Sequence, residues 1–373
     1  MSVYIISFAI STFLMIKSSK QQEIQKKICV IIALLIPCLV AGFRASCIGT
    51  DTQGYLWPMF QAAIKAKSLK EYMSSSWFYI WRDLYVKDYE IGFSMIVFVV
   101  GKIFGNIVPV QVVIQTLTII PIYYAINRNK DYPTWMGMVV YYSMFFNTTL
   151  NLMRQSIAMA FVFLAIQFLS EKEYQKYILF LFIGILFHKS AILGLAIGGI
   201  YILTTKKIEL KYTKADSRNL IIVAIILLGI IALCNINYFV EFLSSIGFDK
   251  YINYINGSIV FMPNQIIIRL PIVILYIINW KIIIEEKDNF RFFVCMLCMD
   301  IICAQFTSVN IYSGRIALFF SQFSIIAFPV FYAKERYKNV NKIILWGYLL
   351  FYWAFFFVLK MQDSTIPYLT IWN

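Results

Sequence analysis

Arg154 and His188 are the residues of this sequence whose chemistry is most conspicuous. Arg154 stands near the start of an apolar run, Leu152–Ser170, and His188, the single histidine of the chain, lies inside the next apolar run. Ionisable side chains at membrane depth are costly, and they usually mark functional sites. The guanidinium of arginine holds phosphate through paired hydrogen bonds, and histidine exchanges protons near neutral pH. The two residues therefore predict a site that binds an anion and moves a proton.

The composition places both residues in an all-α polytopic membrane protein. The chain has 373 residues, of which 61% are hydrophobic and 14% are charged, whereas soluble domains carry about 25% charged residues. The net charge of +14 lies in short loops between apolar runs, which is typical of cytoplasmic loops and not of a nucleic-acid-binding face. Cys295 and Cys298 form a C-x-x-C inside an apolar run without a second pair, so we expect no metal or redox site there.

The elements that must position the site are apolar runs, several of which are shorter than the roughly 20 residues that a bilayer asks for. The first run has no basic segment before it and no small-residue cleavage site, so we expect a span and not a removed signal peptide. The runs are Val3–Ile16, Val30–Phe43, Ile107–Ile126, Thr134–Leu150, Leu152–Ser170, Asn219–Asn235, Gln265–Ile284, Phe292–Phe306, Ile316–Ala333 and Ile343–Leu359.

Basic turns set the expected orientation, because lysine and arginine of short loops stay in the cytoplasm. The turn Lys17–Lys27 is strongly basic, so the N-terminus and the loop Arg44–Glu90 are expected outside. The other turns expected inside are Asn127–Lys130, Glu171–Lys176, Thr204–Lys214, Glu285–Arg291 and Ala333–Lys342.

Two apolar runs need a special interpretation to keep this orientation. Ile91–Phe104 reaches only ~21 Å at ~1.5 Å per residue, so we expect an extracytoplasmic helix lying against the membrane. Tyr177–Leu203 has basic flanks on both sides, which favours a hairpin of two short helices turning at His188 over one long tilted helix. The result is a single domain over residues 1–373 with about 10–12 transmembrane helices or half-helices.

This topology brings seven ionisable residues to or near the extracytoplasmic side, which is unexpected for arginines under the positive-inside rule. Together they predict a cleft that holds a pyrophosphate without a metal, because no D-x-D pair or carboxylate cluster faces outside. The seven are Arg44, Asp51, Glu90, Arg154, His188, Arg269 and Arg315.

Most of these residues also have a purely structural interpretation. Arg44 and Arg315 fit interfacial arginines that reach toward lipid headgroups. Asp51 fits a turn residue, Glu90 fits the N-cap of the following helix, and His188 fits a hydrogen-bonded core residue. Aromatic side chains of the outer loop suit sugar stacking and interfacial anchoring equally well.

Five short motifs, in this order along most of the chain, resemble those of the EpsG family, a branch of the Wzy-type polysaccharide polymerases that join O-antigen and capsule repeat units. Ile91 stands where that family often has proline, which departs from its pattern at the entry to the following helix. The motifs are R-x-x-x-x-G-T-D-x-x-x-Y (Arg44, Gly49, Thr50, Asp51, Tyr55), E-x-G-F (Glu90, Gly92, Phe93), N-x-x-R-Q-x-I-A (Asn151–Ala158), F-H-K-S-A (Phe187–Ala191) and G-R-I (Gly314–Ile316).

The resemblance implies a GT-C-like membrane fold in the bacterial cytoplasmic membrane, with interfacial helices in the first extracytoplasmic loop. It also implies lipid-linked substrates: a growing glycan on polyprenyl (undecaprenyl) pyrophosphate as donor, and a lipid-linked repeat unit as acceptor. A chain-length regulator is a possible partner in such a system, and no cofactor is expected.

The expected reaction is metal-independent glycosyl transfer on the outer face. Arg154, Arg269 and Arg315 would stabilise the charge that develops on the leaving pyrophosphate. His188 or Asp51 would take the proton of the acceptor hydroxyl, and a protonated His188 would instead be a further phosphate ligand. Arg44 and Glu90 complete the expected substrate-binding set.

Two other functions remain open at this point. A flippase or transporter of lipid-linked sugars would call for an inverted repeat and binding groups at the midplane, and the sequence has neither. An O-antigen ligase would perform the same chemistry on a different acceptor.

Overall fold

The structure is a computed structural model that describes residues 1–129, 132–205, 217–235, 260–280, 289–309, 313–334 and 337–372, with positions 238, 241 and 245. Six helices in these ranges are long and apolar enough to cross a membrane, which confirms an all-α polytopic membrane protein. They are Glu23–Gly42, Ile107–Arg128, Met153–Ser170, Asn289–Ser308, Gly314–Ala333 and Lys338–Leu359.

Parts of the expected topology fall outside the described residues. The basic turns 204–214 and 285–291 lie mainly outside them, as do residues 310–312 before Arg315 and 335–336 of the turn 333–342. The number of crossings and the side that each turn faces stay predictions.

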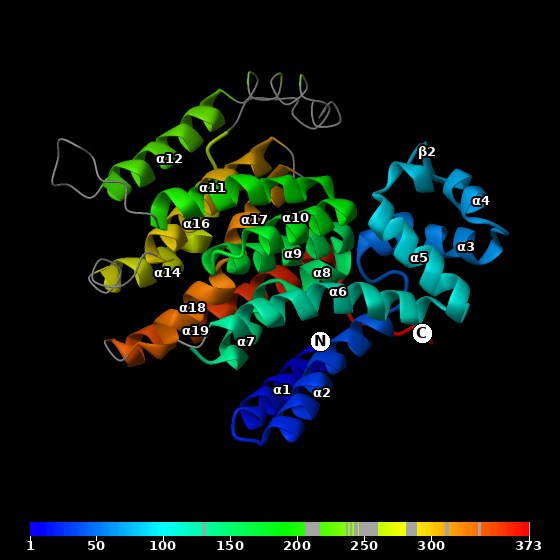
Figure 1. The fold of residues 1–373 in the computed structure, drawn as a ribbon, viewed down its shortest axis with the longest axis horizontal. Helices are drawn as coiled ribbons and strands as arrows, with labels where there is room; N and C mark the ends of the chain where they lie inside the picture. Colours follow the sequence, from blue (N-terminus) through cyan, green and yellow to red (C-terminus); the bar gives the residue numbers. More distant parts are fainter. Residues whose placement is uncertain are drawn as a thin grey trace. The chain divides into compact units, whose positions relative to one another are not determined.

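The described residues form two compact units, Met1–Gly194 with Leu349–Asn373 (unit 1) and Leu195–Tyr348 (unit 2). The expectation of one domain over residues 1–373 stays a prediction. The helices of unit 1 are drawn from blue to green in Figure 1 and are α1 (Ser2–Ser18), α2 (Glu23–Gly42), α3 (Trp57–Lys65), α4 (Leu69–Ser74), α5 (Ile91–Phe104), α6 (Ile107–Arg128), α7 (Thr134–Met144), α8 (Phe146–Asn151), α9 (Met153–Ser170) and α10 (Tyr174–Phe187).

The loop Arg44–Glu90 is itself folded and packs on α5. It contains the π-helix η1 (Thr52–Leu56), α3, α4 and the antiparallel strands β1 (Ser76–Tyr79) and β2 (Arg82–Tyr85). α3, α4 and β2 are labelled in the blue-to-cyan part of Figure 1, next to α5. Phe60 of α3 is buried against Gly101 of α5, within a core that includes Phe93 and Val97. The helices expected in this loop are thus present, and their position on the membrane surface stays a prediction.

The β-hairpin in this loop was not expected from the sequence. Its turn places Ile80 and Trp81 at positive φ, 45° and 65°, where asparagine or glycine is the usual signal. Without that signal, an aromatic segment reads as part of an irregular loop.

The middle of unit 1 is interrupted twice, at positions that matter for the site. The run expected as one span, Thr134–Leu150, is divided at Phe145 into α7 and α8, and Leu152 separates α8 from α9. α9 is apolar all round, and 83% of its residues are buried, as expected for a central helix.

The second interruption confirms the break expected at His188. α10 ends at Phe187, His188 is extended (φ −160°, ψ 128°), and the 3-10 helix η3 (Lys189–Ile192) leads into α11 (Leu193–Thr205). The hydroxyl of Tyr177, near the start of α10, donates to the carbonyl of Gly194, 3.0 Å away, so the chain bends back after His188. A single straight helix through this run is thereby ruled out.

The segment after α19 (Lys338–Trp353) returns to unit 1 through the π-helix η7 (Ala354–Leu359). Residues 361–372 then lie along the chain that follows α2: Ala45 N donates to Leu369 O at 2.9 Å, and Ile371 N donates to Phe43 O at 3.0 Å. The start of the loop Arg44–Glu90 therefore lies beside residues 369–371.

Unit 2 consists of helices and short helical turns around aromatic and aliphatic side chains. Tyr276 packs edge-on against Phe331, with ring centroids 4.9 Å apart. Its elements are α11 beyond the unit boundary, α12 (Ser217–Cys234), α14 (Pro263–Ile278), α16 (Asn289–Ala304), η5 (Gln305–Ser308), η6 (Ser313–Ile316), α17 (Ala317–Ser321), α18 (Ser324–Ala333) and most of α19.

Candidate functional site

Two motifs that lie about a hundred residues apart meet at Asn151. The side-chain oxygen of Asn151 accepts from Thr50 Oγ1 at 2.9 Å and from the backbone N–H of Asp51 at 3.0 Å. Gly49, which precedes Thr50, has φ +79°, and a Cβ at this position would lie 2.6 Å from the carbonyl oxygen of Leu150. The turn Gly49–Asp51, called the G-T-D turn below, therefore packs closely against the end of α8. Only glycine fits at position 49.

We expect Gly49→Ala to lower the stability of the protein markedly. The new methyl group has no space, and alanine at positive φ adds backbone strain of about 1–2 kcal/mol. Thermal unfolding in detergent measures the effect. Gly347→Ala is the matched control, because nothing lies within 4 Å of a Cβ at that position in α19. A Gly49→Ala protein as stable as the control would contradict the close packing.

Arg154 pairs with Glu90 and lies over two tyrosine rings. Its Nη1 is 2.5 Å from Glu90 Oε2, and its guanidinium carbon is 4.8 Å from the ring centre of Tyr55 and 4.7 Å from that of Tyr89. The hydroxyl of Tyr55 donates to Asp51 Oδ2 at 3.0 Å. The G-T-D turn is thus connected to the entry of α5 by a chain of contacts that runs through Asp51, Tyr55, Arg154 and Glu90.

Part of Arg154 remains available to a ligand. Its side chain is 21% exposed, and its buried Nε has no hydrogen-bond partner within the described ranges. An unpaired buried donor is costly. The buried Nε is itself out of reach of a ligand, which would meet the exposed part of the Arg154 side chain instead.

The surroundings shift the pKa values of the groups around Arg154. Burial raises the pKa of Glu90, but the charge of Arg154 and then that of His188 outweigh it, so this pKa is below its ordinary value. Burial raises the pKa of Tyr89 to about 12 and that of Tyr55 well above its ordinary range. Glu90 is therefore ionised and both tyrosines are neutral at neutral pH. The contribution of the ionised Glu90 to stability is present above its unfolded-state pKa and is lost as the pH falls through the lowered folded-state pKa.

His188 reaches the same group of residues from the end of α10. Glu90 Oε1 accepts from the backbone N–H of Lys189 at 3.4 Å, and a Cβ on Gly92 would lie 2.7 Å from the carbonyl oxygen of Leu186. The glycine of the E-x-G-F motif thus lets α5 approach the F-H-K-S-A motif closely, with Glu90 as the shared contact.

The immediate partner of His188 is Ser190, whose Oγ is 2.6 Å and whose backbone N is 3.2 Å from His188 Nδ1. The tautomer with a proton on Nδ1 donates to Ser190 Oγ and leaves Nε2 as a base. The other tautomer accepts from Ser190 N–H and leaves Nε2–H as a donor. This geometry supports both roles that the sequence left open, proton acceptor and phosphate ligand.

Arg44 lies in the interior of unit 1 and not at an open rim. It is 1% exposed, and its guanidinium donates to Ala41 O at 2.5 Å and to Met153 Sδ at 3.2 Å. Burial lowers the pKa of Arg44 to about 10, so the side chain stays charged at neutral pH. Its role in substrate binding stays a prediction.

Arg269 and Arg315 belong to unit 2, where Arg269 is held by a carboxylate that the sequence analysis missed. Asp300 of α16 is 4% exposed and accepts from Arg269 Nε at 2.6 Å and from its Nη2 at 2.8 Å. A lone aspartate within an apolar helix was the signal for such a pair. Arg315 lies in η6 and is partly buried. Because two of the four arginines lie in each unit, their convergence on one cleft stays a prediction.

We expect Asp300→Ala to destabilise the protein by about 3–5 kcal/mol, because it leaves a buried guanidinium without its counterion. The double variant Asp300→Leu with Arg269→Met removes both charges and should recover most of the loss. Chemical unfolding in detergent compares the two variants. A double variant as unstable as the single one would show that the pair is not the cause.

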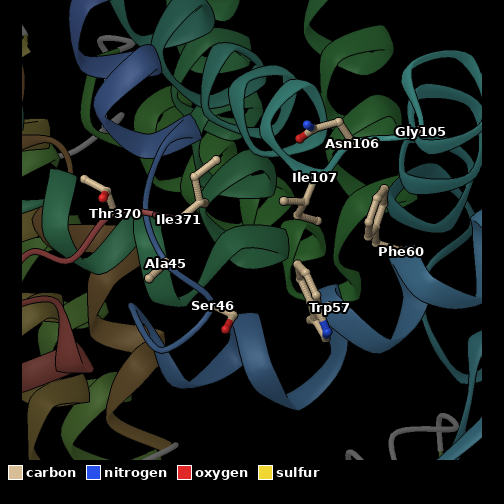
Figure 2. A pocket seen from close by; sticks show the side chains of 9 residues that line it. All are labelled: Ala45, Ser46, Trp57, Phe60, Gly105, Asn106, Ile107, Thr370 and Ile371. Atoms are coloured by element: carbon tan, nitrogen blue, oxygen red, sulfur yellow. The ribbon is translucent and has the colours of Figure 1, made fainter. Parts of the chain in front are cut away.

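A cavity of about 430 Å³ lies elsewhere in unit 1 and has a mainly apolar lining (Figure 2). None of the seven predicted site residues lines it, so we do not assign the chemistry to this cavity. In the part of the chain that the structure describes, no three His, Cys, Asp or Glu side chains gather closely enough to hold a metal ion. The lining residues are Ala45, Ser46, Trp57, Phe60, Gly105, Asn106, Ile107, Thr370 and Ile371.

Comparison with known proteins identifies the family. No curated protein and no solved structure matches the chain. The model of the EpsG family matches residues 27–370, which include all five motifs, the whole of unit 2 and most of unit 1. A multi-pass membrane protein with these motifs, matched over nearly its whole length, belongs to the EpsG family of polysaccharide polymerases.

Proposed function

We propose that this polymerase transfers a growing glycan from polyprenyl pyrophosphate to a hydroxyl of a lipid-linked repeat unit, on the extracytoplasmic face of the bacterial cytoplasmic membrane. The observation that carries the proposal is the group formed by Asp51, Tyr55, Glu90, Arg154 and His188 in unit 1. It combines a partly exposed cation, an imidazole and two carboxylates, from four separate motifs.

The reaction forms one bond between the acceptor oxygen and the anomeric carbon of the donor glycan. The bond from that carbon to the pyrophosphate breaks, and the electron pair leaves with the lipid pyrophosphate. Arg154 stabilises the developing negative charge, because a fixed cation in a poorly solvated site stabilises charge strongly. Arg269 and Arg315 are proposed to add to it from unit 2.

The acceptor hydroxyl must lose its proton in the same step, and His188 is the proposed base. In the tautomer that donates from Nδ1 to Ser190 Oγ, Nε2 carries the lone pair that accepts a proton. Asp51 is the alternative base, although Tyr55 already donates to one of its oxygens. Glu90 fixes the guanidinium of Arg154, and Arg44 stabilises the loop that carries Asp51. The chemistry is metal-independent and of the GT-C type in this proposal.

Incubating the purified protein with lipid-linked repeat units tests the proposal. A ladder of lipid-linked oligomers supports polymerisation. Transfer to lipid A core or to cell wall would identify an O-antigen ligase instead. Movement of the substrate across vesicle membranes with no new glycosidic bond would identify a flippase and overturn the proposal.

A further inference from the structure

Asp363 lies in the segment after η7 and has no assigned role, yet its carboxylate reaches the residue that holds the G-T-D turn. Its Oδ1 accepts from Asn151 Nδ2 at 2.8 Å, and its Oδ2 accepts from Thr148 Oγ1 at 2.8 Å. Thr148 and Asn151 are three residues apart in α8 and therefore share one face of that helix. One carboxylate is thus bound by both side chains, with one oxygen for each.

The backbone around Asp363 adopts an unfavourable conformation to reach this position. Met361, Asp363 and Ser364 have φ of 47°, 66° and 51°, in a region that costs non-glycine residues roughly 1–2 kcal/mol each. The carbonyl of Ser364 accepts from the N–H of Gly49 at 3.1 Å, so the turn that contains Asp363 also contacts the G-T-D turn directly. Strain of this kind persists only where the surroundings enforce it, and it is concentrated at functional sites.

The contacts of Asn151 explain what Asp363 does. An amide side chain has a donor end and an acceptor end. Asp363 accepts from the donor end, which turns the acceptor end toward Thr50 and the N–H of Asp51. If the amide rotated by half a turn, its NH2 group would face these two donors and both bonds would be lost.

We infer that Asp363 is a positioning residue of the polymerase site, which fixes the amide of Asn151 and through it the backbone of Asp51. The inference rests on the proposed function, because it takes Asp51 and its neighbours as the site. It adds the segment that contains residues 361–364 to the elements that build that site. Asp363 does not touch the reacting atoms in this account.

The bond can be tested by exchanging its two partners. Asp363→Leu leaves Asn151 Nδ2 and Thr148 Oγ1 without their acceptor, and Asn151→Asp places two carboxylates face to face. The double variant Asp363→Asn with Asn151→Asp exchanges the two partners. We expect each single variant to lower the polymerisation rate at least about tenfold, as for the loss of one charge-assisted hydrogen bond. In the double variant, Asn at 363 donates to Asp at 151, whose other oxygen still accepts from Thr50 and Asp51. We expect its rate to return to near that of the natural protein.

Thermal unfolding is measured for all variants, and Gln362→Ala, an exposed neighbour in the same turn, serves as the control with an unchanged rate. A folded double variant that is as slow as Asn151→Asp would overturn the inference, since exchange of the two partners would then fail to restore the site. Single variants with the natural rate would overturn it too. If the single variants do not fold, the double variant decides alone. Full activity in Asp51→Ala would instead refute the proposed site.

Discussion

Arg154→Gln is expected to lower the polymerisation rate by about 100–1,000-fold and to leave lipid-linked single repeats accumulating. Removing one preorganised group that stabilises developing charge has an effect of this size. Arg154 is suited to that task because Glu90 and two tyrosine rings hold it, while its side chain remains 21% exposed.

The loss must be separated from damage to the fold, because Arg154→Gln leaves the Glu90 carboxylate buried and unpaired. Adding Glu90→Gln removes that charge, so the double variant should regain stability and remain inactive. Arg128→Gln is the matched control: Arg128 also pairs with glutamates, also lies over aromatic rings and is 19% exposed, against 21% for Arg154. Normal chain lengths in Arg154→Gln would refute its role.

His188→Ala is expected to lower the rate by about 100–10,000-fold if His188 is the base. The natural protein should then lose activity on acidification through the range in which histidines protonate, whereas a carboxylate base would keep it. Initial rates of oligomer formation across this range measure the profile. A fully active His188→Ala combined with an inactive Asp51→Asn would transfer the role to Asp51.

Ser190→Ala distinguishes the two tautomers of His188. Without Ser190 Oγ, Nδ1 loses its hydroxyl acceptor and retains the backbone N–H of Ser190 as a donor, which favours the tautomer that carries its proton on Nε2. A base at Nε2 would then work more slowly, by about tenfold for the loss of one hydrogen bond near 1.4 kcal/mol. A neutral His188 that donates to phosphate from Nε2–H would be unaffected, because its Nδ1 still accepts from the backbone N–H of Ser190. An unchanged rate in Ser190→Ala therefore favours the ligand role.

Charge and hydropathy were sufficient to predict the membrane class, the helix Ile91–Phe104 with its observed bounds, and the break at His188. Each of these follows from local rules: the length of an apolar run, the sign of its flanks, and the cost of a polar residue inside it. The motifs supplied Asp51, Glu90, Arg154 and His188, which the structure brings into contact through Tyr55 and Lys189.

What could not be predicted depends on contacts between distant residues. Asp300 stood in an apolar run, and only the structure shows that it faces Arg269. Asp363 resembles an ordinary loop residue, because no periodicity relates position 363 to position 151. Arg44 opens a loop in the sequence and is nevertheless buried, since the segment 361–372 covers that loop.

The contact between Asn151 and Asp363 spans 212 positions of the chain, and this separation sets when the site is completed during synthesis. Residues 361–364 follow the helix Lys338–Leu359, so they become available only after the membrane helices before them have been made. When the helix Lys338–Leu359 has just been made, all seven predicted site residues are present, yet Asn151 and Thr148 still lack the carboxylate that orients them. Synthesis of the chain therefore completes the supported site only after the helix Lys338–Leu359 has been made.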